Sequence, residues 1–299
     1  MNRTTKCLYR DRWLYLMMVP GLLFFIIFRY APMYGVIIAF QDFRIRAGIF
    51  GSEWVGLMHF EAFFTSPHFS RVMSNTIILS FYHMLFGFPI PILFALLLNE
   101  LRHNGFKRFV QTVTYLPHFI SWVVIGNLAL IMLAPHTGLI SQMLNTVTGR
   151  NLNLLMNPNY FRGVLVATDI WRSMGWSAII YLAAIAGVDP ALYEAADIDG
   201  AGRGQKMFHI TFPAIRNVIV IMLLLRVAFI LDAGFEQILI MSNPLVNDVT
   251  EIIDTYVFRV GLLRAEHSYG TAVNLFKSVV GLTLVLIVNR ISKRWEAGI

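Results

Sequence analysis

Charged residues fall inside several long apolar runs, and five of them are candidates for a functional site. Asp169 and Arg172 share one run, and Arg226, Asp232 and Glu236 share another. A charge in apolar surroundings is costly, so each is a candidate for a functional site. The three-residue spacing of Asp169 and Arg172 allows an ion pair on one helix face, and such a pair is more often a structural contact than a binding site. Asp232 and Glu236 are like charges at i,i+4 and predict a wet cavity or a partner subunit around them.

Patterns for catalysis or metal binding are missing from the sequence. The eight histidines form no HExxH motif or other close ligand pair, and Cys7 is the single cysteine, so it has no partner for a disulfide or a metal site. The stretch GAGRGQK lacks the register of a phosphate-binding loop, G-x4-G-K-[ST]. Gln205 stands where the second glycine should be, and Met207 follows Lys206. We therefore expect no enzyme activity, no metal and no ATP binding in this chain.

The elements that must position these residues are membrane-spanning helices. Of 299 residues, 57% are hydrophobic and 14% charged, a composition typical of a lipid environment. A helix of about 20 apolar residues crosses about 30 Å of hydrocarbon. The sequence predicts an all-α, polytopic protein with six such spans, at residues 13–28 (or as far as 40), 76–98, 109–133, 163–187, 214–241 and 271–289.

The first apolar run has a second interpretation as a secretory signal, because basic residues precede it. No small-x-small cleavage site follows the run, and Arg29, Tyr30 and Pro32 come next. Cys7 lies before the run, where no lipoprotein signal would place it. We therefore expect an uncleaved first span.

Basic residues predict the orientation of the spans, because cytoplasmic loops are enriched in lysine and arginine. With both termini in the cytoplasm, twelve basic residues are inside: Arg3, Lys6, Arg10, Arg12, Arg102, Lys107, Arg108, Arg203, Lys206, Arg290, Lys293 and Arg294. Seven lie in the longer outside segments: Arg44, Arg46, Arg71, Arg150, Arg162, Arg259 and Arg264. The net charge of +7 is therefore mainly an orientation signal, and it requires no nucleic acid.

This orientation predicts four regions along the chain. They are a cytoplasmic N-terminus at 1–12, a first span with an outer loop and surface helix at 13–75, a five-span core at 76–289 and a cytoplasmic C-terminus at 290–299. In the outer loop, Ser66 and Pro67 predict the start of a short amphipathic helix on the membrane surface. The core includes the longest predicted cytoplasmic loop, 188–213.

That loop reads VDPALYEAADIDGAGRGQKMFHITFP. Asp189 is suited to cap a helix over Pro190–Ile198, with the proline in its first turn. The glycines of Gly200–Gly204 then allow a sharp turn. A second short helix or turn leads to Pro213 at the start of the fifth span. We expect a compact helix-turn-helix beneath the membrane.

The loop also carries a family resemblance. It fits the spacing EAA-x3-G-x9-I-x-L-P at Glu194, Ala195, Ala196, Gly200, Ile210 and Pro213. Phe212, another apolar residue, stands where the pattern has leucine. The chain thus resembles the permease subunits of bacterial binding-protein-dependent ABC importers, which have the type I importer fold. The segments DRWLYLMMVPGLLFF, YAPMYGVIIAFQDF and FPIPILFALLLNE resemble the maltose-type carbohydrate branch, especially permeases for oligo- and polysaccharides.

The resemblance implies that the loop is a coupling helix seated on an ATP-binding subunit. The residues expected at that contact are Tyr193, Glu194, Ala195, Ala196, Asp199, Gly200 and Pro213. It also implies a second permease, commonly a different chain, two subunits that hold ATP and magnesium, and location in the bacterial cytoplasmic membrane. An external solute-binding protein is expected to dock on residues 41–75 and 243–270. By composition alone, a flexible turn with a solvated glutamate is an equal alternative for the loop.

A carbohydrate substrate implies a pathway with hydroxyl partners and aromatic rings, because sugars present both hydroxyls and apolar ring faces. For a single aromatic residue, however, packing or lipid contact is the commoner role. Pro89, Pro91 and Pro117 predict helix kinks, which serve either gating or the shape of the bundle. The residues expected along the pathway are Asn127, Trp171, Trp176, Tyr181, Phe229, Asp232 and Asn274.

Two other classes of protein remain as alternatives. A self-sufficient sugar transporter driven by an ion gradient usually carries an internal repeat near the membrane midplane. Residues 1–150 and 151–299 show no such repeat. A membrane enzyme or scaffold has less support, because no catalytic constellation is visible.

Overall fold

The structure is a computed structural model that describes residue 10 and residues 12–296. Most of the predicted cytoplasmic N-terminus, with Cys7, and the last three residues of the predicted C-terminus lie outside the described residues. The described chain is all-α, as predicted, apart from two strands of two residues each. It divides into two compact units: Met1–Ser66 with Val257–Phe276, and Pro67–Tyr256 with Lys277–Ile299.

The first unit holds the N-terminal helical segment and a small cluster of short elements. Its core includes Phe63, which is 1% exposed and contacts Tyr269 and Phe276. Gly261 and Gly270 allow close backbone approach, since a Cβ on Gly270 would lie 2.6 Å from the Gly261 Cα. The elements are α2 (Arg12–Phe25), η1 (Ile26–Tyr30), α3 (Ala31–Met33), η2 (Tyr34–Phe40), β1 (Gln41–Asp42), α4 (Gly48–Gly51), the antiparallel β2 (Glu53–Trp54), α5 (Met58–Thr65), η5 (Phe258–Leu263) and the start of α19 (His267–Glu296).

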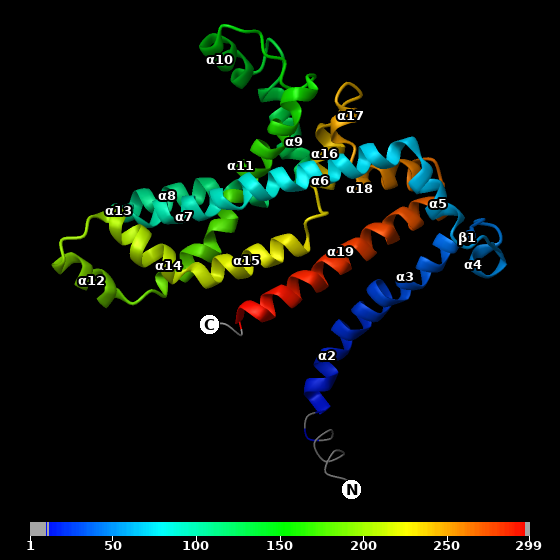
Figure 1. Cartoon of the computed structure of the whole chain (residues 1–299), viewed down its shortest axis with the longest axis horizontal. Coiled ribbons are helices and arrows are strands. Elements are labelled where there is room, and N and C mark those ends of the chain that lie inside the picture. The colour runs from blue at the N-terminus through cyan, green and yellow to red at the C-terminus, as the bar shows by residue number, and fades with distance from the viewer. Residues whose placement is uncertain (1–9, 11, 297–299) are drawn as a thin grey trace. The chain divides into compact units, whose positions relative to one another are not determined.

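The second unit holds the remaining helices, with α12 and α13 together at one end (Figure 1). The longest helix wholly within it, α11, packs along α6, α7 and α8. The elements are α6 (Pro67–Gly87), α7 (Pro89–Asn99), α8 (Asn104–Tyr115), η3 (Leu116–Phe119), α9 (Trp122–Met132), α10 (Leu139–Thr148), α11 (Pro158–Ala186), α12 (Pro190–Ile198), α13 (Arg203–Lys206), η4 (Met207–Thr211), α14 (Phe212–Ala214), α15 (Arg216–Ala228), α16 (Phe235–Met241), α17 (Asn247–Thr250), α18 (Ile253–Val257) and the rest of α19.

Two buried apolar clusters hold the second unit together. One joins α6, α9, α11 and α16 around Leu79, Phe161 and Ile238. The other joins α7, α11 and the start of α15, with Leu96 and Ala178 among its members. Where α11 passes α8, Gly175 removes the side chain that would block contact, because a Cβ there would lie 2.3 Å from the carbonyl oxygen of Thr114.

Candidate membrane spans are of two kinds. Three segments are long and apolar enough on their own: Arg12–Phe40, Pro67–Asn99 and His267–Arg290. Three more qualify only as helix pairs joined at sharp bends: Asn104–Phe119 with Trp122–Met132 at 107°, Pro158–Ala186 with Pro190–Ile198 at 71°, and Arg203–Ala214 with Arg216–Ala228 at 59°. The described residues therefore hold six spans when each bent pair counts as one, which agrees with the predicted number.

Two local predictions are wrong. The predicted fifth span, 214–241, is not one helix, because α15 ends at Ala228 and α16 begins only at Phe235. Between them Gly234 adopts a left-handed conformation, φ +86°, which a continuous helix does not allow. Pro67 does not start a short surface helix either, since no breaker follows and α6 runs 21 residues to Gly87. The short helix there is α5, which ends at Thr65.

The predicted proline kinks do not coincide with the sharp bends. Pro117 lies in η3, whereas the 107° bend follows Phe119, between η3 and α9. Pro89 opens α7 after an interruption of the helix at Phe88, and α6 and α7 still count as one span. A proline in the first helical turn costs little, because the N–H it lacks would have no partner there.

Candidate functional site

The helix of the 188–213 loop begins and ends as the sequence predicts. The Asp189 carboxylate accepts a hydrogen bond of 2.9 Å from the backbone of the first turn of α12. At the other end Gly200 has φ +73°, and the N–H groups of Gly200 and Ala201 donate to carbonyls of the last turn at 3.1 and 2.8 Å. This is the glycine-terminated ending that satisfies the free carbonyls of a helix.

The two halves of the loop are joined by side-chain contacts. The hydroxyls of Tyr193 on α12 and Thr211 on η4 are 2.9 Å apart. Lys206 on α13 forms an ion pair with Asp197 on α12. Thr211 is buried, whereas Asp197 is exposed. Since α14 and α15 follow η4 directly, these contacts connect α12 to the start of α15.

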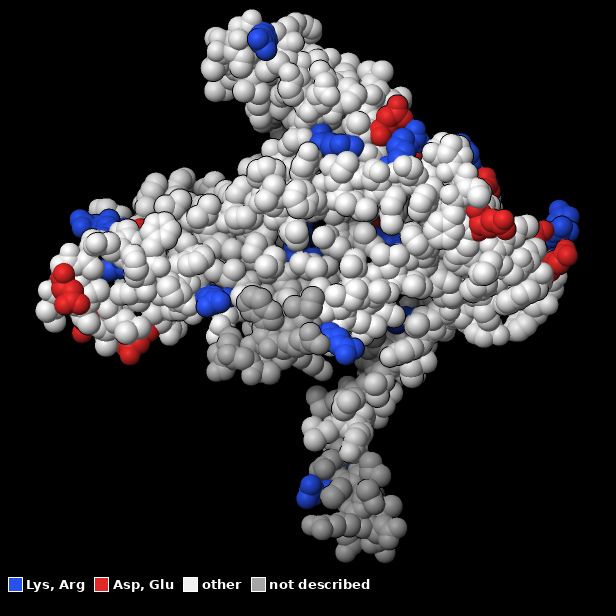
Figure 2. Space-filling view, in the orientation of Figure 1, with Lys and Arg blue, Asp and Glu red and all other residues white. Residues whose placement is uncertain are grey.

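The outward face of α12 carries exposed apolar residues together with acidic ones, and it has no covering within the described chain. Leu192 is 51% exposed and Ile198 88% exposed, and Ala195 lies between them at helical spacing. Ala196 and Tyr193 are half-buried and turned toward the rest of the loop. Figure 2 shows acidic and basic residues around this end of the molecule, in contrast to the largely uncharged surface beside it. The arrangement is suited to seat in a cleft of another protein.

Three of the predicted pathway residues meet at one cavity. Trp176 and Tyr181 on α11 and Phe229 after α15 line a space of about 390 Å³. Asp232 lines a smaller recess that shares Arg226 and Phe229 with this cavity. The remaining three residues are elsewhere: the Asn127 amide donates to a carbonyl of its own helix at 2.7 Å, Trp171 is exposed on α11 away from the cavity, and Asn274 belongs to the first unit.

The predicted list omitted polar residues of the same cavity. Asp169, Ser173 and Ser177 line it from α11, and Arg226 lines it from α15. A signal for the first three was present, because spacing of four residues, together with Trp176, places them on one face of a helix. Among the described residues, no group of three or more His, Cys, Asp or Glu side chains is placed to hold a metal ion.

Arg172 does not form the ion pair with Asp169 that their spacing allows. Its guanidinium donates to the carbonyl oxygens of His118 and Ile120, at 3.3 and 3.4 Å, and lies 4.7 Å from the ring centre of Trp122. These carbonyls lie at the sharp bend between α8 and α9, where helical partners are missing, so the arginine satisfies them. His118 in turn stacks on Trp176 with ring centres 4.7 Å apart, which fixes the indole beside the cavity.

Asp232 and Glu236 do not share a helix face, because the break at Gly234 separates them. Both are exposed. Asp232 lies 3.7 Å from the ammonium group of Lys277, which also pairs with Asp254 at 2.6 Å. Sequence reasoning missed Lys277, which interrupts the last apolar run. Its positive charge compensates the negative charges of Asp232 and Asp254.

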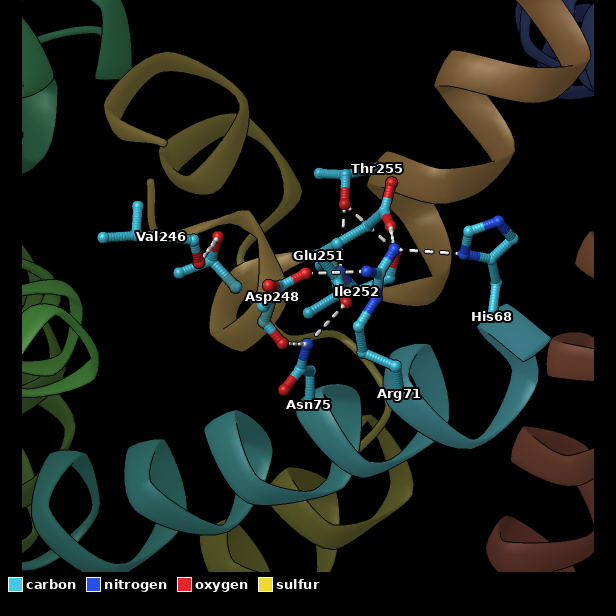
Figure 3. A network of polar contacts seen from close by, with 9 residues as sticks. His68, Arg71, Asn75, Val246, Asp248, Glu251, Ile252 and Thr255 are labelled. Atoms are coloured by element: carbon cyan, nitrogen blue, oxygen red, sulfur yellow. Dashed lines mark hydrogen bonds and ion pairs between the residues drawn. The ribbon is translucent and has the colours of Figure 1, made fainter. Parts of the chain in front are cut away.

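A second polar cluster joins α6 to the segment around α17 (Figure 3). Arg71 contacts Asp248 at 2.7 Å and Glu251 at 2.8 Å. The Asn75 amide nitrogen donates to the backbone carbonyls of the same two residues. Arg162 on α11 completes the cluster by donating to the Asn75 side-chain oxygen at 2.6 Å. Sequence reasoning missed this cluster, because its contacts join residues that are 87 to 180 positions apart in the chain.

Comparison with known proteins places the chain among transport components. Residues 87–297 match the family described as binding-protein-dependent transport system inner membrane component. The chain is 48% identical to the polygalacturonan/rhamnogalacturonan transport system permease protein YteP of Bacillus subtilis (strain 168), over 98% of this chain and 91% of that protein. It is 46% identical to protein LplB of the same organism, over 97% and 91%.

Solved structures give the same result for the fold. A chain of a bacterial ABC transporter involved in the import of the acidic polysaccharide alginate superposes with a TM-score of 0.90 at 40% identity, covering 98% of this chain and 99% of that one. A second structure, of a bacterial alginate ABC transporter in complex with an alginate pentasaccharide-bound periplasmic protein, gives 0.89 at 39% identity and covers 98% of each chain.

Proposed function

The chain belongs to the family of binding-protein-dependent transport system inner membrane components, and on that premise we propose that it is a permease subunit of an ATP-driven importer of oligo- or polysaccharides. Two similar proteins are named for the transport of polygalacturonan/rhamnogalacturonan and of alginate, which supports a saccharide substrate. The cavity beside Trp176, Tyr181 and Phe229 supports it further, since ring faces suit sugars. The chain is a non-catalytic subunit, and ATP with its magnesium ion binds to partner subunits.

The observation that carries this proposal is the uncovered face of α12. This helix acts as the coupling helix, with Tyr193, Glu194, Ala195, Ala196, Asp199, Gly200 and Pro213 at or beside an ATP-binding subunit. Closure of two such subunits displaces α12. The Tyr193–Thr211 and Asp197–Lys206 contacts carry the displacement through η4 to α15. Because α15 supplies Arg226 to the cavity, ATP binding alters the wall that faces the saccharide.

The full importer contains this chain, a second and different permease, two ATP-binding subunits and an external solute-binding protein. The second permease completes the pathway beside the cavity. Both termini and α12 face the cytoplasm, which places the ATP-binding subunits there. The segments 41–75 and 243–270 face outside and receive the solute-binding protein, in keeping with the alginate transporter that was solved with a periplasmic protein.

Uptake by reconstituted vesicles tests the proposal. Vesicles with both permeases, the ATP-binding pair and the binding protein should accumulate a labelled oligosaccharide only with ATP. A Walker-lysine substitution in the ATP-binding subunit should abolish accumulation. Uptake by this chain alone, driven by an ion gradient, would instead identify a secondary transporter and overturn the proposal.

Gly200→Val tests the coupling role directly. A β-branched residue is strongly disfavoured at φ +73°, although no atom lies within 4 Å of the Cβ position, so the change acts through the backbone alone. We expect transport to fall more than tenfold while the protein still inserts and ATP hydrolysis by the complex persists. Gly204→Val is the matched control, since Gly204 also has open space but no positive φ. Equal transport by both variants would contradict the coupling role of α12.

A further inference from the structure

Two buried polar side chains of α6 lack hydrogen-bond partners near the cavity. The Ser80 hydroxyl and Nε2 of His83 are inaccessible and make no hydrogen bond within the described chain. The two residues are 5% and 3% exposed. A buried polar group without a partner is costly, so its presence calls for an explanation such as water or a ligand. Ser80 lines the small recess that it shares with Arg226, Phe229 and Asp232.

Two charged side chains face the same space from different helices. Asp169 on α11 and Arg226 on α15 both line the cavity. Among the described residues, neither side chain forms a hydrogen bond or an ion pair, and they are not paired with each other. His83 interacts electrostatically with both. Inside a membrane protein, an arginine in this position needs an anionic or strongly polar partner.

Other charges in the second unit show how such groups are usually accommodated. Lys277 is paired with Asp254, and Arg172 is held by backbone carbonyls. Asp232 lines the recess that shares Arg226 and Phe229 with the cavity, and the ammonium group of Lys277 lies 3.7 Å from its carboxylate. Arg226 and Asp169 therefore differ from Lys277 and Arg172 in facing an open space instead of a protein partner.

We infer that Arg226 and Asp169 form a subsite for an acidic saccharide, in which Arg226 binds a sugar carboxylate and Asp169 accepts hydrogen bonds from hydroxyls of the same or the next sugar. The guanidinium offers parallel N–H donors that match a carboxylate. A carboxylate such as Asp169 accepts from several hydroxyls. Trp176, held by its stack with His118, contributes a ring face. This inference rests on the proposed function and names the substrate class for the same cavity.

The subsite discriminates by charge. A neutral saccharide gives Arg226 only hydroxyl oxygens, whereas a uronate gives it an anion. A charge-assisted hydrogen bond is stronger than a neutral one, so affinity for the acid should exceed that for its neutral ester by about tenfold or more. The position of Asp169 opposite Arg226 limits binding of a densely charged ligand, since a carboxylate placed beside it is repelled.

Binding to the purified complex of both permeases and the ATP-binding subunits, without the binding protein, tests the subsite. The probes are tri-galacturonate and its methyl ester, which differ only in the charge of the carboxylates. Calorimetry should show tighter binding of the acid. Arg226→Gln should weaken acid binding at least tenfold and leave ester binding unchanged. Arg226→Lys should give an intermediate loss, and Asp169→Asn should strengthen acid binding.

Arg216→Gln, on the same helix but outside the cavity, is the matched control and should change neither affinity. Each variant is also checked by its melting temperature without ligand. Equal affinity of the unaltered complex for acid and ester, or no binding of either, would overturn the subsite. So would an Arg226→Gln variant that melts earlier and loses both ligands equally, because that identifies a structural role. ATP-driven uptake of a neutral saccharide would leave the proposed function standing in every such case.

Discussion

Helix α6 carries two polar regions that differ in how their groups are satisfied. Toward its start, Arg71 and Asn75 bind the segment around α17, and only Nε of Arg71 lacks a partner there (Figure 3). One to two turns later, the Ser80 hydroxyl and Nε2 of His83 are buried and have no hydrogen-bond partner among the described residues. Both regions lie on the same helix and in the same unit, so burial alone does not explain the difference.

The difference separates polar groups that hold the fold from polar groups that await a ligand. In the Arg71 region, side chains of α6 and α11 fix a segment that has little regular structure of its own. In the cavity region, Asp169 of α11 and Arg226 of α15 line open space, and Ser80 of α6 lies next to Arg226 in a recess with no room for a water molecule. Removing a member of the first region should therefore cost stability, and removing a member of the second should cost binding.

The largest stability loss is expected for Arg71→Met. The Glu251 carboxylate is 4% exposed and would lose the guanidinium that faces it. Breaking a buried charge pair costs about 3–5 kcal/mol, and the partial exposure of Arg71 reduces this to roughly 2–3 kcal/mol. Asp248→Asn is the control, because Asp248 is 82% exposed and should cost little. Thermal and denaturant unfolding of the purified protein measures both, and equal stability of the two variants would remove the distinction between the regions.

A smaller loss is expected for Gly175→Ala, a change on α11, the helix that supplies Asp169 and Trp176 to the cavity. The added Cβ would lie 2.3 Å from a backbone oxygen of Thr114, so α11 and α8 must separate. Overpacking of this kind costs about 1–3 kcal/mol. Gly163→Ala on the same helix has open space and should be tolerated. The melting temperature should fall for the first variant only, and a fall in both would indicate a general requirement for glycine in α11.

The sequence was sufficient to predict the local structure of the 188–213 loop, because its determinants are close together in the chain. Asp189 caps α12, Pro190 occupies its first turn, and Gly200 ends it with a positive φ. Each of these effects depends only on the residue type and on backbone groups a few residues away. The number of spans followed in the same way, from length and hydropathy alone. Such features do not depend on where other helices lie.

The cavity was only partly predictable because its determinants are distant in sequence. The apolar run at 214–241 gave no sign that the chain stops being helical before Gly234. Arg172 has a good local partner in Asp169, but the bend near Pro117 offers free carbonyls that bind it instead. Asn127 and Trp171 have suitable chemistry for a sugar, yet neither lies at the cavity. The sequence thus identified the types of side chain that suit a sugar, whereas the packing of the helices determines which of them line the cavity.

The finest test of the two regions uses two hydroxyls one helical turn apart. Thr76 is fully buried, and its hydroxyl accepts a hydrogen bond of 3.0 Å from the backbone N–H of Ile253. Thr76→Val leaves that N–H without a partner and should cost about 1–3 kcal/mol. Ser80→Ala removes a hydroxyl that has no protein partner, so stability should stay within about 0.5 kcal/mol or rise.

Saccharide affinity should respond in the reverse order. Ser80→Ala removes a polar group beside Arg226 and should weaken tri-galacturonate binding a few-fold, whereas Thr76→Val should leave the affinity of the folded complex unchanged. Unfolding curves and calorimetry on the same two preparations give both readouts. If Ser80→Ala destabilises the protein as much as Thr76→Val does, then the Ser80 hydroxyl has a structural partner. In that case α6 does not carry one polar region that stabilises the fold and another that binds a ligand.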